Sequence, residues 1–178
     1  MSHYCDRAPG HPFHGPYHDH EYGFPVHHDH LLFERLVLEI NQAGLSWLTV
    51  LKKRAALRAA FENFAIARIA RYGEAERARL LADAGIIRNR LKVDAVIYNA
   101  GVTETLQAEH GSLRVWLDDH HPLDHAAWVR LFRRTFRFTG PEITGEFLMS
   151  TGYLPGAHRD DCPVQARILA AGPPWTLG

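Results

Sequence analysis

Residues 80–96, LLADAGIIRNRLKVDAV, contain two helical segments on either side of a glycine. The first segment is expected to end near Ala84 and the second to begin near Arg88. Gly85 would permit a tight reversal, Ile86 and Ile87 would anchor it in the core, and the free amides of the second helix could hold a phosphate. This pattern is typical of a helix-hairpin-helix, although an ordinary turn with a solvated basic face would look similar. The candidate DNA contacts here are Gly85, Ile87, Arg88, Arg90 and Lys92.

Helical patterns extend from this hairpin in both directions. Apolar residues recur at helical spacing after Asp29, the expected N-cap, until Gly44 ends that helix. Ser46 is expected to cap the next helix, with a break near Arg54. Further helices are predicted at about 65–71, 75–83, 88–108, 112–119, 124–136 and 143–152. Strand and hairpin signals are scarce, so the predicted fold class is all-α.

Composition sets the limits of this fold. A chain of 178 residues with 46% hydrophobic content can form one sizeable core, so residues 1–178 are expected to be a single domain. Residues 1–27 are predicted to be an irregular arm, and residues 153–178 a C-terminal segment that becomes loosely packed coil after Cys162. The net charge is zero, so nucleic-acid contacts must come from local patches. Without an apolar leader or a membrane-length segment, we expect a cytoplasmic protein.

Two cysteines and two histidines are candidate metal ligands: Cys5, His18, His158 and Cys162. The spacing of His158 and Cys162 brings both donor atoms to one point. Two thiolates and two imidazoles suit a closed, structural zinc site rather than a hydrolytic one. Spacing alone leaves open two buried free cysteines with incidental histidines, because several other histidines compete with His18. If zinc is bound, it joins the N- and C-terminal segments.

Glu39 is the carboxylate for which a functional role is easiest to argue. It lies at the edge of an apolar helical stripe, where it could be an ordinary boundary residue or part of a pocket. In a pocket with Tyr17 and Trp47, it could accept hydrogen bonds from a purine amine and favour a cationic base. Trp47, Tyr17 and Tyr22 could stack on an extruded base, although core packing is the commoner role of such rings.

Four segments together resemble one protein family. They are YHDHEYG at residues 17–23, EINQAGLSW at 39–47, DAGIIRNRLK at 83–92 and the pair His158 and Cys162. The chain is similar over residues 4–162 to the DNA-3-methyladenine glycosylase I family of bacteria, in the helix-hairpin-helix superfamily. It departs from that family at Arg7, His14, Tyr22 and Pro141-Glu142, and these departures affect the expected substrate preference more than the fold.

The resemblance implies a monomeric, monofunctional DNA-repair enzyme. Such an enzyme hydrolyses the glycosidic bond of alkylated purines, chiefly 3-methyladenine, in double-stranded DNA and has no lyase activity. Glu39 would be the catalytic group and would bind the base with Tyr17, Trp47 and Tyr22. Gly44 and Leu45 would fill the gap that the flipped nucleotide leaves. The implied ligands of a structural zinc are Cys5, His18, His158 and Cys162.

Three other functions fit parts of the sequence. A zinc-containing module that binds damaged DNA without cleaving it would have the same hairpin, and a zinc hydrolase would explain only the histidines. A glycosylase with a different alkylated-base preference is also compatible. Asp118 and Asp119 lie where the wider superfamily often carries a catalytic aspartate, but no motif supports a role for either residue.

Overall fold

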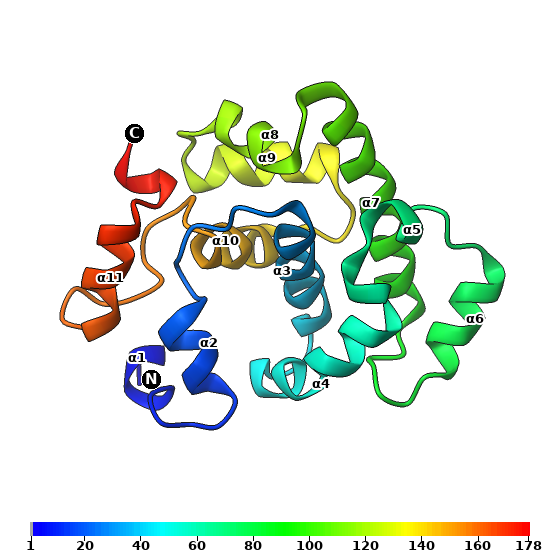
Figure 1. The fold of residues 1–178 in the computed structure, drawn as a ribbon, viewed down its shortest axis with the longest axis horizontal. Coiled ribbons are helices and arrows are strands. Elements are labelled where there is room, and N and C mark those ends of the chain that lie inside the picture. Colours follow the sequence, from blue (N-terminus) through cyan, green and yellow to red (C-terminus); the bar gives the residue numbers. More distant parts are fainter. Residues whose placement is uncertain (1) are drawn as a thin grey trace.

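The computed structural model describes residues 2–178, and within that range every regular element is helical (Figure 1). This confirms the predicted all-α class. The elements are α1 (Tyr4–Arg7), α2 (His14–His20), α3 (Asp29–Gln42), α4 (Trp47–Ala60), η1 (Glu62–Phe64), α5 (Ile66–Ile69), α6 (Glu74–Ala82), α7 (Arg90–His110), α8 (Leu113–His120), α9 (His125–Thr135), α10 (Pro141–Ser150), α11 (Pro163–Ala171) and η2 (Pro174–Thr176).

Helix α3 lies at the centre of the fold, because two of its faces are buried against different groups of helices (Figure 1). One face packs into a core formed mainly with α4 to α7, and the other into a core formed with α8 to α10. A helix that is apolar around most of its circumference must be covered in this way. The first face carries Phe33, Val37 and Leu38, and the second carries Leu32, Leu36 and Ile40.

The internal helices lie close to the predicted ranges, with two local corrections. Helix α4 runs without interruption through Arg54, so the predicted break is absent. Asp29 is the first residue of α3 rather than its N-cap, which is His28. The Asp29 carboxylate instead accepts hydrogen bonds from the backbone amides of Leu113 and Arg114, at 2.8 and 3.2 Å. It therefore caps α8, which is 84 residues away in sequence.

Both ends of the chain are more ordered than predicted. The N-terminal arm contains α1, with a reciprocal cap between His3 and Asp6, and α2. The segment after Cys162 is the helix α11, not coil, with Pro163 at its first position and Gly172 in the left-handed conformation at its end. Proline at the start and glycine just past the end are known helix boundary signals. Helices α1, α2 and α11 lie on the same side of the fold (Figure 1).

The predicted hairpin forms between α6 and α7. Ile86 is buried in the core and Ile87 packs against it, as expected. Gly85 does not need a left-handed backbone, since its φ is not positive. Close packing favours glycine here, because an added Cβ would lie 3.2 Å from Ala56 Cβ and 3.0 Å from Asp83 Oδ1. Helix α7 begins two residues later than expected, after the N-cap Asn89.

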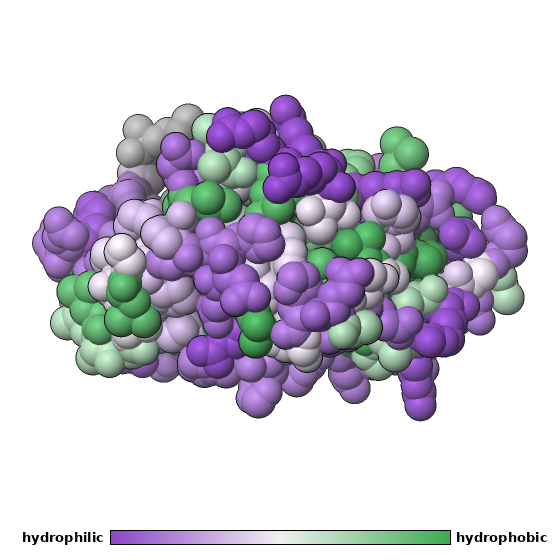
Figure 2. Space-filling model, turned by 90° about the horizontal axis from the view of Figure 1, so that it is seen from above, coloured by the Kyte–Doolittle hydropathy of each residue, from purple (hydrophilic) through white to green (hydrophobic). Residues whose placement is uncertain are grey.

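Polar side chains cover most of the face shown in Figure 2, and the apolar patches there are small and separated from one another. Within residues 2–178, no helix is both long enough and apolar enough to cross a membrane.

Candidate active site and metal cluster

A cleft of about 1250 Å³ opens between the C-terminal end of α3 and the N-terminal half of α10. On the α3 side it is lined by Glu39, Gln42 and the loop that carries Gly44 and Leu45. Pockets that bind small molecules usually have volumes of ~300–1000 Å³, so this cleft is large enough for one extruded nucleotide. Its remaining walls are formed by His125, Gly140, Pro141, Glu142, Ile143, Gly145, Glu146, Met149, Leu154 and Pro155.

Glu39 is the unusual carboxylate of this cleft. It is 4% exposed, yet within the described residues no group donates a hydrogen bond to it. Burial raises the pKa of Glu39 well above its usual range; the charge of Glu146 adds to this rise, and Arg35 opposes it. Because Glu39 lines the cleft, its carboxylate is available to a molecule that enters there, and a raised pKa in a cleft is typical of a functional group.

The three predicted aromatic residues form one cluster. The ring of Tyr17 lies 5.1 Å from that of Trp47 and 5.7 Å from that of Tyr22, measured between centroids. Tyr17 is buried, whereas Trp47 and Tyr22 are partly accessible. Burial raises the pKa of Tyr17 and of Tyr22, and the charge of Glu39 adds a smaller contribution to both. None of the three rings is among the cleft-lining residues, so the aromatic cluster lies outside the described cleft wall.

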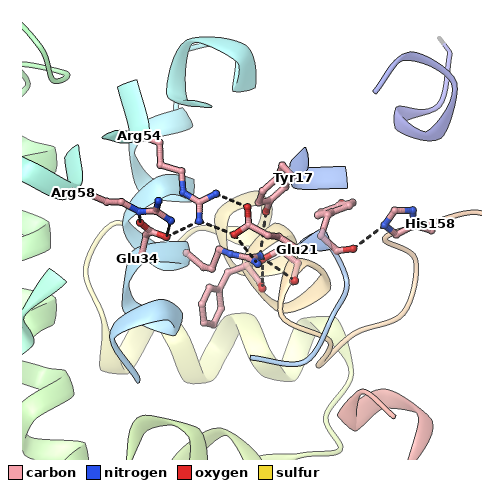
Figure 3. Close-up of polar contacts among 10 residues, drawn as sticks. Tyr17, Glu21, Glu34, Arg54, Arg58 and His158 are labelled. Carbon is pink, nitrogen blue, oxygen red and sulfur yellow. Dashed lines mark hydrogen bonds and ion pairs between the residues drawn. The ribbon is translucent and has the colours of Figure 1, made fainter. Parts of the chain in front are cut away.

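A network of partly buried ion pairs and hydrogen bonds lies beside Tyr17 (Figure 3). The Arg54 guanidinium donates to both carboxylate oxygens of Glu21 at 2.7 Å and to Glu34 at 2.6 Å. Arg35 donates to the Tyr17 hydroxyl at 3.4 Å and to the Ser150 carbonyl at 3.2 Å. These bonds join α2, α3, α4 and α10, and the bond from Arg35 holds the Tyr17 ring in position.

Lys92 departs from the prediction that it contacts DNA. Its side chain is only 5% exposed, and its ammonium donates to the carbonyls of Asn41 at 2.8 Å and Ala43 at 2.6 Å. These carbonyls lie at the end of α3, where the helix leaves them without an internal partner. Lys92 therefore connects the hairpin helix α7 to the loop of Gly44 and Leu45. The φ of +77° at Gly44 favours glycine at that turn.

We expect Lys92→Met to lower the free energy of unfolding by about 2–3 kcal/mol, because two buried carbonyls lose a charged donor. Lys53→Met is the matched control. The Lys53 ammonium also lies near two carbonyls, at 3.4 and 3.5 Å, but these contacts are exposed. Its removal should change stability by no more than about 0.5 kcal/mol. Urea unfolding measures both variants, and equal losses would contradict the assigned role of Lys92.

The two predicted arginines of the hairpin differ in their pairing. Arg88 and Arg90 are both exposed. Arg90 lies 3.1 Å from a Glu74 oxygen and 3.8 Å from an Asp94 oxygen. Among residues 2–178, no carboxylate lies within 4.0 Å of the Arg88 guanidinium. Arg88 is therefore the cation of this hairpin that is available to an external phosphate.

The four predicted ligands meet at one buried point. The possible ligand atoms of Cys5, His18, His158 and Cys162 all lie within 4.8 Å of one another, and both cysteines are free thiols. His158 Nδ1 is 3.6 Å from Cys5 Sγ and 3.4 Å from Cys162 Sγ, and His18 Nε2 is 3.7 Å from Cys162 Sγ. This arrangement could hold a metal ion.

The other ring nitrogens of the two histidines have partners of their own. His18 Nδ1 lies 2.7 Å from an Asp19 carboxylate oxygen, and His158 Nε2 lies 2.7 Å from the Tyr22 carbonyl (Figure 3). Metal-binding histidines usually have such a partner, which fixes the ring so that the remaining nitrogen faces the ion. The cluster also joins α1 and α2 to the start of α11, and so connects the two ends of the chain.

Comparison with known proteins gives a consistent result. A family model described as Methyladenine glycosylase matches residues 8–128. The chain belongs to the methyladenine glycosylase family. DNA-3-methyladenine glycosylase 1 of Escherichia coli (strain K12) is 47% identical over 164 residues, which cover 80% of this chain and 87% of that protein. The DNA-3-methyladenine glycosylase of Haemophilus influenzae is 34% identical over 166 residues, which cover 83% and 89%.

A solved structure agrees with this assignment. The 3-methyladenine DNA glycosylase I of Staphylococcus aureus, whose structure addresses 3-methyladenine recognition, is 30% identical to this methyladenine glycosylase. The two superpose with a TM-score of 0.79 over 90% of this chain and 95% of that one. The resemblance inferred from the sequence motifs is therefore confirmed at the level of family and helical fold.

The structure adds one acidic residue, Glu146, to the predicted site and places two others, Asp118 and Asp119, outside it. Sequence reasoning missed Glu146, a second cleft carboxylate that the local pattern of α10 does not distinguish from a surface residue. Asp118 accepts a hydrogen bond from the Tyr153 hydroxyl at 2.7 Å, and Asp119 lies 3.7 Å from the His110 ring. Neither aspartate is among the cleft-lining residues.

Proposed function

We propose that this chain is a monofunctional DNA glycosylase that releases 3-methyladenine from double-stranded DNA during base-excision repair. The observation that carries the proposal is the buried, unpartnered carboxylate of Glu39 at the cleft, beside an aromatic cluster. The named activity of relatives that are 47% and 34% identical supports the same substrate.

The chemistry of the substrate explains why such a site is sufficient. Methylation at N3 gives adenine a positive charge, which weakens the glycosidic bond and makes the base a good leaving group. The protein must extrude the nucleotide and bind the cationic base while water attacks the anomeric carbon. Neutral adenine stays stacked and lacks the charge that a carboxylate attracts.

The cleft and the neighbouring aromatic cluster would have separate roles in this mechanism. Glu39 would accept hydrogen bonds from the exocyclic amine and face the positive charge, and it is the proposed catalytic group. The rings of Trp47, Tyr17 and Tyr22 would supply the flat surface that a cationic base favours. Gly44 and Leu45 lie at the cleft, and Leu45 is 41% exposed, which suits a wedge that fills the vacated stack.

The same geometry supports the absence of lyase activity. A lyase needs an amine that can attack the sugar, and no lysine is among the described cleft-lining residues. Lys53 lies near the carbonyls of Ala84 and Gly85, and Lys52 lies 5.8 Å from the centroid of the Phe13 ring. Borohydride should therefore trap no covalent adduct on an abasic product.

The Cys5–His18–His158–Cys162 cluster fits a structural zinc. Zinc bonds of about 2.3 Å to sulfur and 2.0–2.1 Å to nitrogen place tetrahedral sulfur and nitrogen ligands roughly 3.5 Å apart. The three sulfur–nitrogen distances, 3.4, 3.6 and 3.7 Å, agree with that value. Four protein ligands leave no open position, so zinc would supply a structural link between the chain ends and take no part in the reaction.

The hairpin would hold the DNA backbone, with Gly85 and Ile87 at its turn and Arg88 and Arg90 beside the N-terminus of α7. We expect Arg88→Ala to weaken binding similarly for damaged and undamaged duplexes, and to reduce the slope of log affinity against log salt by about one. Arg90→Ala should have a smaller effect, because Arg90 already pairs with Glu74 and Asp94. Fluorescence anisotropy at several salt concentrations measures both slopes, and a larger effect of Arg90→Ala would contradict this assignment.

Base release from methylated duplex DNA tests the proposed function. Wild-type protein should release free 3-methyladenine, detected by chromatography. Trp47→Ala should release it roughly 5- to 150-fold more slowly, which corresponds to the loss of one stacking surface. Binding of methylated DNA without release would mean that the chain is a recognition module and not an enzyme.

A further inference from the structure

A second carboxylate, Glu146, faces the cleft opposite Glu39. Glu146 lies on α10 and Glu39 on α3, and the two helices pack against each other. The charge of Glu146 contributes to raising the pKa of Glu39, after the larger effect of burial. Within residues 2–178, neither carboxylate has a cationic nitrogen within 4.0 Å. The cleft thus presents two carboxylates that no ion pair neutralises.

Tyr22 holds Glu146 in its place. The Tyr22 hydroxyl donates to Glu146 Oε2 at 3.1 Å, while the Tyr22 carbonyl lies 2.7 Å from His158 Nε2. A phenol has a single proton to donate, so Tyr22 has none left for a ligand. In the described chain, no group donates to the other oxygen of Glu146, which remains free to accept from a molecule in the cleft.

Glu39 and Glu146 therefore give the cleft an edge that carries only hydrogen-bond acceptors when both groups are ionised. An ionised carboxylate only accepts hydrogen bonds. A cationic base that enters the cleft stabilises the ionised form of both groups. A purine with a 6-amino group can donate two protons to such an edge. A 6-oxo group instead brings another acceptor, and it leaves the carboxylate oxygens of the buried Glu39 and the half-buried Glu146 without a donor. Sites of this type discriminate strongly, because the wrong ligand leaves buried polar groups unpaired.

We propose that Glu146 is a specificity-determining residue, which with Glu39 makes the pocket select N3-alkylated purines with a 6-amino group over those with a 6-oxo group. This inference rests on the proposed function and assigns to Glu146 the choice between 3-methyladenine and 3-methylguanine. Tyr22 acts as a positioning residue, since it holds the Glu146 carboxylate towards the cleft.

Competitive base release tests this assignment. One duplex preparation that contains both 3-methyladenine and 3-methylguanine is incubated with wild-type protein and with Glu146→Gln, and both free bases are quantified. The glutamine places an N–H donor where a carboxylate oxygen stood. We expect the ratio of 3-methyladenine to 3-methylguanine release to fall about tenfold. If wild-type release of 3-methylguanine is below detection, its appearance in the variant is the expected result.

Glu109→Gln is the matched control. Glu109 lies on α7, is exposed and is not among the cleft-lining residues. Its substitution removes the same charge without adding a donor in the cleft, so the ratio should stay at the wild-type value. An unchanged ratio in Glu146→Gln, or an equal loss of both bases, overturns the inference but leaves the proposed function intact. Wild-type protein that releases neither base overturns the proposed function itself.

Discussion

Cys162→Ala should lower the melting temperature by roughly 8–20 °C and remove the bound metal. The predicted zinc links Cys5 to His158, which are 153 residues apart in sequence. By analogy with a disulfide that closes a loop of this length, the link restricts the unfolded chain by about 4–5 kcal/mol. For a domain of this size, each kcal/mol corresponds to about 2–4 °C. Metal analysis and thermal unfolding together measure this effect.

A chelator separates loss of metal from loss of packing. It should lower the melting temperature of the wild-type protein, and added zinc should restore it. In Cys162→Ala the chelator should have no further effect, because the site is already broken. A wild-type protein that contains no zinc and whose melting temperature is insensitive to chelator would show that the cluster is only a set of buried thiols and imidazoles.

Glu39→Gln should slow the release of 3-methyladenine by about 10- to 150-fold, because it removes a charged hydrogen-bond acceptor that faces a cation. The same substitution should stabilise the free protein at neutral pH by roughly 1–2 kcal/mol, as is common where a functional group is held in an unfavourable environment. Base-release kinetics and thermal unfolding measure the two effects. Slower release together with higher stability distinguishes a substrate-facing carboxylate from a structural one.

The stability gained in Glu39→Gln should depend on pH, and its direction follows from the pKa of Glu39. The pKa of Glu39 is raised in the folded protein. The protonated carboxyl of Glu39 therefore contributes fully to the stability of the fold below the pKa that Glu39 has in the unfolded chain. This contribution is lost as the pH rises through the pKa of the folded protein. The excess stability of Glu39→Gln should therefore be near zero at about pH 4, close to the unfolded pKa, and should grow as the pH rises above it.

Glu34→Gln is the matched control on the same helix. Burial alone would raise the pKa of Glu34, but hydrogen bonds from Arg58 and Arg54 lower it below its usual range. Its contribution to stability is therefore present above the unfolded pKa and lost in acid, the reverse of Glu39. Glu34→Gln should destabilise the protein at neutral pH by about 1.5–3 kcal/mol and approach the wild type in acid. A stability change of the same sign in both variants would contradict this account.

Local signals predicted the middle of the chain well. The helical period of α3, the Ser46 cap of α4 and the isoleucines of the hairpin all depend on residues close in sequence, and the structure confirms them. The N-terminal helices were missed because they are short and depend on contacts with distant segments. Helix α11 could have been found, since Pro163 and Gly172 mark its two ends.

The site was less predictable because its residues act across long sequence separations. Lys92 looks like a surface cation in a basic stretch, and only the fold shows that it binds carbonyls 49 and 51 residues away. Glu146 gains its significance from Tyr22, which is 124 residues earlier in the chain. His18 could not be separated from neighbouring histidines until α2 placed its ring against Cys162. The resemblance to the family implied the full set of metal ligands, whereas the spacing of the residues alone left the set open.

A crystal structure of the protein with free 3-methyladenine would show whether the cleft binds the base. We expect the base to lie in the cleft between α3 and α10, with its exocyclic amine within hydrogen-bonding distance of the Glu39 carboxylate and its face against the Trp47 ring. A base bound elsewhere on the protein, or one in the cleft whose amine turns away from Glu39, would contradict this expectation.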